Sequence, residues 1–173
     1  MAAGRAFALF RAALCLSTAL MMAISWPLWV TGGEFPRVPW FGWVHLLPAW
    51  ASWMRFAAAM VAIAVAAVPW RRERVGLTAL GAALALSAWM VLEDQFRLQP
   101  WMYQFLLMGF ALAACRETRA TALCRWFTIA IYFHSGLSKL DSGFIGYTGR
   151  SFLHHLTKSF GLDSWWWTER AQN

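Results

Sequence analysis

The sequence predicts an all-α membrane protein, a multi-pass bundle of about five transmembrane helices with its N-terminus in the cytoplasm. Apolar residues fill 60% of the 173 positions, charged residues fill 13%, and the mean hydropathy is +0.47. Soluble domains are usually about 45–50% apolar and about 25% charged. Thirteen tryptophans and thirteen phenylalanines suit aromatic belts at two membrane interfaces.

Five apolar runs approach the roughly 20 residues that a membrane-spanning helix needs. They are residues 12–30, 50–68, 75–91, 101–115 and 123–139. The first run is long and lacks a small-residue cleavage site, which favours a retained span over a secretory signal. Pro100 suits the first turn of the fourth helix. We therefore treat residues 1–173 as one transmembrane domain.

The first outer loop and the C-terminal tail lie outside these runs, and each has a distinct composition. The first outer loop, residues 31–48, is rich in Pro, Gly and Trp and predicts a short interfacial helix or re-entrant turn. The tail, residues 142–173, is interfacial or re-entrant, because residues 152–162 are interrupted by polar side chains and Trp165–Trp167 is typical of an interfacial anchor.

Arginines alternate between loops and predict the orientation. They precede the first run, follow the second, and surround the turn between the fourth and fifth; they are Arg5, Arg11, Arg71, Arg72, Arg74, Arg116, Arg119 and Arg125. By the positive-inside rule these loops are cytoplasmic. Lys139 and Asp141 then lie at the extracytoplasmic end of the fifth run. The net charge of +7 comes from these clusters, so we expect no nucleic-acid partner.

The cysteines and histidines predict neither a disulfide framework nor a metal site. Cys15 lies in an apolar run, and Cys115 and Cys124 flank a loop expected in the cytoplasm, where thiols stay reduced. We predict no metal site, because the adjacent His154 and His155 point to different sides of a helix.

Lys139 is the first candidate for chemistry, since a charge at membrane depth costs about 3 kcal/mol on insertion scales. It is one of two lysines, against thirteen arginines. Spacings of four, three and four residues place a polar stripe on one face of the fifth helix: Thr128, Tyr132, Ser135 and Lys139. Gly136 would allow close approach of another backbone or a flat ligand. Alternatively, Lys139 snorkels to the interface and pairs with Asp141.

The outer loop of residues 93–101 is the second polar cluster. Its carboxylates and amides, Gln99 among them, could close over a pocket, but we favour a solvated connector in which Trp101 and Tyr103 are interfacial anchors. Arg55, inside the second run, faces the bundle or snorkels, and nothing in the sequence selects its partner.

The segment Tyr132-Phe133, Gly136, Lys139-Leu140-Asp141 and Gly146-Tyr147 resembles a motif of the vitamin K-dependent γ-glutamyl carboxylases. Those enzymes share the horizontally transferred transmembrane domain, whose start is similar to Ala8-Leu9-Phe10-Arg11. The resemblance implies that Lys139 is the base that deprotonates a reduced quinone such as vitamin K hydroquinone. It also implies a quinone site to which Tyr132, Ser135, Gly136, Asp141 and Gln99 contribute.

The chain departs from the carboxylases at several points. Ser138-Lys139 stands where they carry two lysines, and Gln99-Pro100 where they carry asparagine and histidine. The sequence also lacks their later spans and lumenal domain, so we do not expect complete γ-carboxylation by this chain alone, and an inactive relative is a further alternative.

A second resemblance is to the small DoxX- and MauE-type membrane proteins, which also contain Ser-Gly-x-x-Lys motifs. It implies a non-enzymatic membrane subunit that assists a respiratory or periplasmic redox system, with a membrane or periplasmic protein as partner. Whether the protein is an enzyme stays open between the two resemblances. Both imply a bilayer, and a bacterial inner membrane in particular.

Overall fold

A computed structural model describes residues 2–30, 38–42, 48–70, 73–141 and 143–159, and these form helices and no strands. The all-α prediction is therefore confirmed. The chain divides into two compact units, residues 1–127 and 128–173. We describe each unit by itself.

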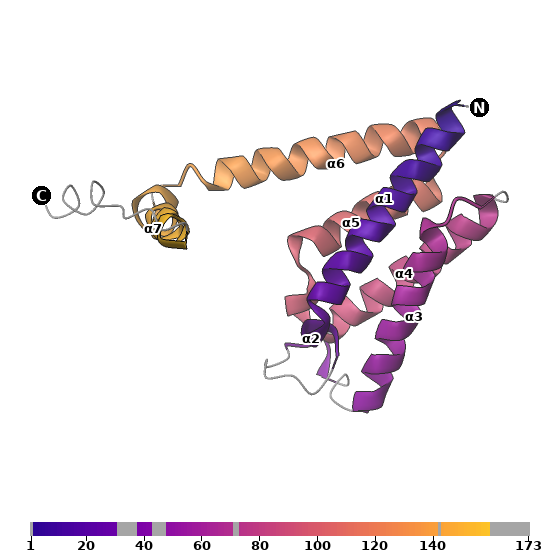
Figure 1. Ribbon diagram of the computed structural model, residues 1–173, viewed down its shortest axis with the longest axis horizontal. Helices are drawn as coiled ribbons and strands as arrows, with labels where there is room; N and C mark the ends of the chain where they lie inside the picture. Colours follow the sequence, from indigo (N-terminus) through magenta and orange to yellow (C-terminus); the bar gives the residue numbers. More distant parts are fainter. Residues whose placement is uncertain (1, 31–37, 43–47, 71–72, 142, 160–173) are drawn as a thin grey trace, which may run out of the picture. The chain divides into compact units, whose positions relative to one another are not determined.

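The first unit contains most of the helices (Figure 1). They are α1 (Ala2–Ile24), α2 (Trp26–Trp29), α3 (Ala49–Ala67), α4 (Glu73–Glu93), the 3-10 turn η2 (Gln95–Arg97), α5 (Pro100–Ala114) and the start of α6 (Glu117–Ser138). The second unit holds the rest of α6, the π-helical turn η3 (Phe144–Thr148) and α7 (Gly149–Ser159).

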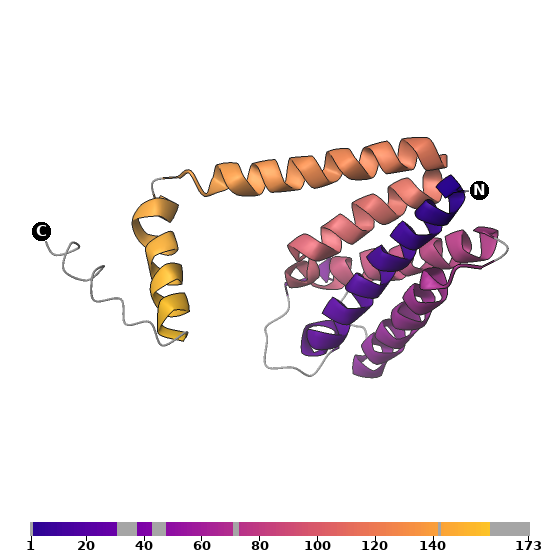
Figure 2. The same ribbon diagram turned by 45° about the horizontal axis from the view of Figure 1, so that its top comes forward.

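Four helices of the first unit form a bundle in which each helix packs on two neighbours. α1 and α4 both pack against α3 and against α5, as the two views in Figures 1 and 2 show. α4 and α5 approach closely, because a Cβ added to Gly109 would lie 2.7 Å from the Leu84 side chain. Glycine therefore lets these two helices come close.

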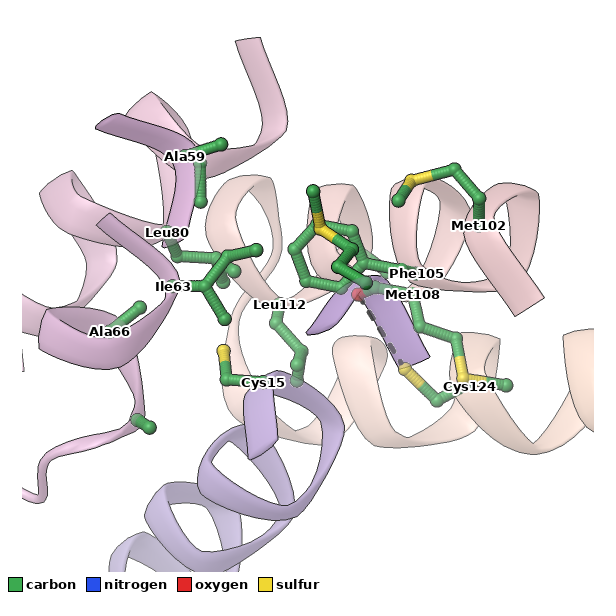
Figure 3. Close-up of a cluster of buried hydrophobic side chains, with 14 of the residues drawn as sticks. Cys15, Ala59, Ile63, Ala66, Leu80, Met102, Phe105, Met108, Leu112 and Cys124 are labelled. Carbon is green, nitrogen blue, oxygen red and sulfur yellow. Dashed lines mark hydrogen bonds between the residues drawn. The ribbon is translucent and has the colours of Figure 1, made fainter. Parts of the chain in front are cut away.

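Small and flexible apolar side chains fill the centre of this bundle (Figure 3). Cys15, Ile63, Leu80 and Phe105 are fully buried and come from α1, α3, α4 and α5 respectively. Ala120 and Cys124 are also buried, so the first turns of α6 belong to the same core. The three cysteines are free thiols.

Three helices are long and apolar enough to cross a membrane: Gly4–Ile24, Trp50–Ala67 and Glu73–Glu93. Only 28%, 28% and 33% of these segments is buried inside the protein, so the rest of each segment is at least partly exposed, as lipid-facing side chains are. α5 is apolar but has only 15 residues, and α6 has 22 residues but carries several polar and charged ones. The fourth and fifth spans and the cytoplasmic N-terminus stay predictions.

Tryptophans gather where α1 ends and α3 begins. Trp26 on α2 packs on Trp53 of α3, and Trp29 packs on Trp101 of α5, each with ring centroids 5.7 Å apart. Trp50 and Trp53 are largely exposed. Exposed indoles in one band at the helix ends are typical of a membrane–water interface.

Most helix positions follow the predicted runs. Runs 50–68, 75–91 and 101–115 coincide with α3, α4 and α5 to within two residues at each end. The first and fifth runs differ from their helices. α6 begins at Glu117 instead of residue 123 and ends at Ser138. α1 begins at Ala2 and ends at Ile24, and a second short helix follows that contains Pro27. Proline has no N–H to continue the α-helical ladder, so the chain turns there. Residues 31–37 and 43–47 of the first outer loop and Trp165–Trp167 lie outside the described residues.

Candidate functional site

Lys139 follows directly after the last residue of α6. Its backbone N–H donates to the Gly136 carbonyl (3.1 Å), and the N–H of Leu140 donates to the Leu137 carbonyl (3.0 Å). These i to i−3 bonds tighten the end of the helix, as 3-10 bonds often do. The side chain of Lys139 is exposed.

The helix before Lys139 presents the predicted polar face. Tyr132 is 73% exposed and Ser135 is also exposed, and both lie on α6 at positions that share a face with Lys139. A Cβ at Gly136 would meet nothing within 4 Å, so the backbone there is open to a flat molecule. The structure thus keeps Tyr132, Ser135, Gly136 and Lys139 together.

Asp141 does not pair with Lys139. Its Oδ2 accepts a hydrogen bond from the backbone N–H of Gly143 (3.1 Å), a local turn contact. Of the ion pairs recorded among the described residues, none includes Lys139. The alternative in which Lys139 is neutralised by Asp141 is therefore not the arrangement observed.

Gln99 belongs to the other compact unit. It is the N-cap residue of α5, it is half-buried, and its Nε2 donates to the Phe96 carbonyl (2.7 Å). Its side chain therefore stabilises the turn between η2 and α5. The remaining predicted site residues all lie on the second unit.

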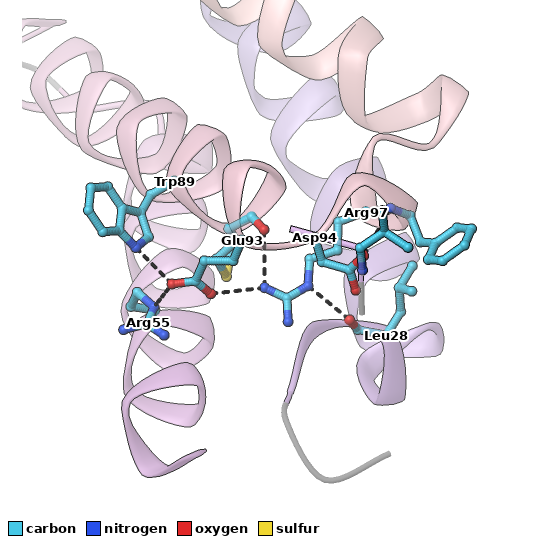
Figure 4. Close-up of polar contacts among 9 residues, drawn as sticks. Leu28, Arg55, Trp89, Glu93, Asp94 and Arg97 are labelled. Atoms are coloured by element: carbon cyan, nitrogen blue, oxygen red, sulfur yellow. Dashed lines mark hydrogen bonds and ion pairs between the residues drawn. The ribbon is translucent and has the colours of Figure 1, made fainter. Parts of the chain in front are cut away.

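Glu93 is the centre of a buried polar network that the sequence analysis did not predict (Figure 4). Its Oε1 lies 2.8 Å from Arg55 Nε and accepts a hydrogen bond from Trp89 Nε1 (2.7 Å). Its Oε2 accepts from Arg97 Nη1 (3.1 Å). Glu93 and Arg97 are 4% and 1% exposed, and the Arg55 side chain is 19% exposed. One carboxylate thus joins two arginines from different elements.

Arg97 extends this network to two helix ends. Besides Glu93, its guanidinium donates to the carbonyls of Met90 (3.1 Å) and Leu28 (3.0 Å), which lie in the last turn of α4 and in α2. Carbonyls at the end of a helix lack partners within the helix, so Arg97 supplies donors to groups that would otherwise be buried without them.

Asp94 connects the same turn to the outer loop. Its Oδ1 accepts from the N–H groups of Phe96 (3.1 Å) and Val38 (3.4 Å), and Val38 in turn accepts from the N–H of Gln95 (2.9 Å). Asp94 is 4% exposed. The expectation of a solvated connector at residues 93–101 is therefore wrong, because its charged side chains are turned inward and pair with one another and with helix ends.

Two signals in the sequence could have indicated this network. Glu93 and Arg97 are four residues apart, a spacing that brings opposite charges together on a helical path. Arg55 is an unmatched cation in an apolar run, and such a residue normally has an acidic partner within the bundle. Neither signal says that both arginines share one carboxylate.

A second arginine contact holds the other end of α3 and α4. Arg11 is fully buried, donates to the carbonyls of Ala66 (2.9 Å) and Val68 (3.2 Å), and pairs with Glu73. A Cβ at Gly76 would lie 2.7 Å from the Arg11 guanidinium. Arg11, predicted as a loop charge, is thus a packing residue that caps α3 and binds the start of α4.

The Glu93 network and the Lys139 segment differ in the chemistry that they can perform. The carboxylate of Glu93 already accepts two hydrogen bonds and forms an ion pair with Arg55, and Arg97 donates to three acceptors, so the bundle itself occupies both groups. Lys139 is an exposed ammonium that can donate to a ligand or, when deprotonated, accept a proton. The Lys139 segment is therefore the better candidate for ligand chemistry, and the Glu93 network the better candidate for a structural role.

Comparisons with known protein families, with curated proteins and with solved structures find no match for this chain.

Proposed function

We propose that this chain is a multi-pass protein of a bacterial inner membrane that binds a lipid-soluble quinone at Lys139. The observation that carries the proposal is an exposed lysine outside any recorded ion pair of the described residues, at the end of a helix face that also presents Tyr132 and Ser135. The class of ligand comes from the resemblance of this segment to the carboxylase motif. Asp141, two residues after Lys139, is the further member of the site in this proposal.

The chemistry of an amine suits this role. As an ammonium, Lys139 donates a hydrogen bond to a quinone carbonyl; as a free amine, it takes the hydroxyl proton of a hydroquinone, leaving the hydroquinone anion and a lysine ammonium. A guanidinium cannot perform the second step, because it does not lose its proton in proteins. The open backbone at Gly136 leaves room for the ring beside the amine.

The proposal includes five spans and an extracytoplasmic Lys139. α6 has 22 residues and is therefore about 33 Å long, against a hydrocarbon core of about 30 Å. Its first turn carries Glu117 and Arg119, and Lys139 follows its last, so the charges at its ends can reach the two interfaces. In this proposal Lys139 lies at the membrane surface, where the polar head of a quinone can meet it.

A non-enzymatic membrane subunit of the DoxX or MauE type is the second candidate. The observation that favours it is the apolar surface around Lys139: Phe133, Leu137 and Leu140 are 64%, 52% and 71% exposed. A partner protein or lipid would cover these side chains. In this case Lys139 only ends the helix at the interface, and arginine can replace it.

The test is binding of decylubiquinone to the purified full chain in lipid vesicles. We expect saturable binding that Lys139→Ala weakens about tenfold or more, as for loss of one hydrogen bond from a charged donor. Arg119→Ala is the matched control, because it removes one positive charge from an exposed position at the other end of α6. Equal affinity in the Lys139→Ala and unmodified chains would refute the proposal.

Lys139→Arg separates the two candidate functions. An arginine keeps the hydrogen-bond donor but cannot accept the proton, so we expect it to bind decylubiquinone and to be unable to take the hydroxyl proton of the corresponding hydroquinone. The hydroquinone anion, measured by its ultraviolet absorption, should then not form by proton transfer to residue 139. If Lys139→Arg matches the unmodified chain in both measurements, the subunit candidate is favoured and the role of Lys139 as a base is wrong.

A further inference from the structure

α7 separates apolar and basic side chains onto opposite faces. At 100° per residue, Phe152, Leu153 and Leu156 fall within an arc of about 100°. Arg150, His154 and Lys158 follow one another at intervals of four residues on the opposite side. The helix has eleven residues and none of them is acidic.

Both faces of α7 are exposed. Phe152, Leu153 and Leu156 are 63%, 47% and 41% exposed, and Arg150 and Lys158 are exposed as well. Among the described elements, η3, which comes directly before it, is the one against which α7 packs extensively. Tyr147 in η3 is 81% exposed and adds an aromatic side chain beside the helix.

We infer that α7 lies flat on an anionic lipid surface, with Phe152, Leu153 and Leu156 inserted and its basic side chains at the level of the head groups. A helix with a clear apolar face, a basic opposite face and low overall hydrophobicity is the kind that binds in the plane of the interface. Each lysine or arginine close to an anionic surface adds to this attraction.

The length and the charge of α7 exclude a membrane-spanning orientation of this helix. Eleven residues extend about 16 Å, roughly half of the hydrocarbon core, and two permanent cations near the ends would have to be buried to insert the helix vertically. The same chain carries three helices long and apolar enough to cross a membrane, so a bilayer surface is available to α7.

Anionic lipid also suits α7 better than a protein partner does. The apolar face consists of three side chains, a small area for a stable protein interface, which usually buries about 800 Å² on each side. Arg150 and Lys158, near the two ends of α7, can each contact a lipid phosphate, because an anionic bilayer surrounds the helix with phosphates. A protein would have to supply acidic groups at these positions, whereas an anionic bilayer supplies them everywhere.

The test is a spin-label scan of α7 in the full chain, reconstituted in vesicles of phosphatidylcholine with and without phosphatidylglycerol. Labels are placed one at a time at positions 151–156, in a background in which the three native cysteines are replaced by alanine and the circular dichroism is unchanged. If that background does not fold, a spin-labelled residue introduced by amber suppression into the unmodified sequence gives the same readout. Collisions with oxygen report the lipid phase, and collisions with a nickel chelate report water.

With phosphatidylglycerol present, we expect labels at 152, 153 and 156 to favour oxygen over nickel several-fold, and labels at 151, 154 and 155 to show the reverse. Without it, or in the Arg150→Gln, Lys158→Gln double variant, this contrast should fall at least twofold. Equal nickel access around the helix would overturn the inference in favour of a solvated helix. Exclusion of both reagents at 152, 153 and 156 would overturn it in favour of protein packing, and identical results in the two lipids would refute the part played by charge.

Discussion

Arg97 donates a hydrogen bond of 3.1 Å to Glu93 one helical turn earlier, and both side chains are buried at the end of the helix bundle. The same Glu93 pairs with Arg55 of α3, so this contact joins elements that are far apart in the sequence. An equivalent arrangement at the other end of α3 and α4 is built on Arg11 and Glu73. The buried arginines Arg97 and Arg11 thus stabilise the two ends of the α3–α4 pair.

Glu93→Gln is expected to destabilise the protein by about 3 kcal/mol or more. The substitution leaves the buried Arg97 and the partly exposed Arg55 without a counter-charge. Breaking a buried ion pair from one side typically costs about 3–5 kcal/mol. The measurement is the apparent free energy of unfolding in mixed detergent micelles, followed by circular dichroism. Glu117→Gln, at an exposed carboxylate, should change it by less than about 1 kcal/mol. Equal effects of the two variants would contradict the structural role of Glu93.

Arg97→Lys should be more harmful than Arg55→Lys. The Arg97 guanidinium reaches Leu28, Met90 and Glu93 at once, and the single nitrogen of lysine would leave at least one buried carbonyl unpaired, at about 1–3 kcal/mol. Arg55 makes one recorded ion pair from a partly exposed position, so lysine should cost less than about 1 kcal/mol there. The same unfolding assay decides the order, and the reverse order would be incompatible with these contacts.

Two glycines of α4 should respond to alanine with opposite signs. At Gly81 nothing lies within 4 Å of an added Cβ, so Gly81→Ala should stabilise the helix by up to about 1 kcal/mol. At Gly76 the added methyl would meet the Arg11 guanidinium, which is held by Ala66, Val68 and Glu73. Gly76→Ala should therefore destabilise the protein despite the better helix propensity. A stabilised Gly76→Ala variant would show that Arg11 is not held in this position.

The predicted orientation can be tested with one introduced thiol. A membrane-impermeant maleimide should label Asp141→Cys on intact spheroplasts, because residue 141 is expected on the extracytoplasmic side. The native Cys115, partly exposed at the end of α5, should react only after lysis, while Cys15 and Cys124 are buried. Labelling of Cys115 on intact spheroplasts, or of position 141 only after lysis, would reverse the orientation.

How far the sequence predicts this structure differs from one element to another. The apolar runs locate α3, α4 and α5 because these helices are bounded by proline or by charged residues. The start of α1 is missed because Arg5 and Arg11 lower its hydropathy, although Arg11 is inside the bundle and has carbonyls and Glu73 as partners. A hydropathy pattern counts the charge of a residue but not the non-local contacts that neutralise it.

The same limit explains why the sequence did not predict the burial of the polar residues after α4. Glu93, Asp94 and Arg97 read as a solvated loop because polar side chains between two spans usually face water, and the partner of Arg55 lies on another helix. Tyr132 and Ser135 depend only on local helical spacing, so the sequence places them correctly on α6, and Lys139 follows directly after its last residue. Their chemistry depends on a ligand, which no pattern of spacing can identify.

Photolabelling with an azidoquinone is the most direct test of the proposed function. The full chain in lipid vesicles is irradiated with the probe, digested, and the labelled peptide is identified by mass spectrometry. We predict labelling within residues 131–147 that excess decylubiquinone prevents and that Lys139→Ala strongly reduces. Labelling confined to other helices, or labelling that decylubiquinone does not prevent, would contradict a quinone site at Lys139.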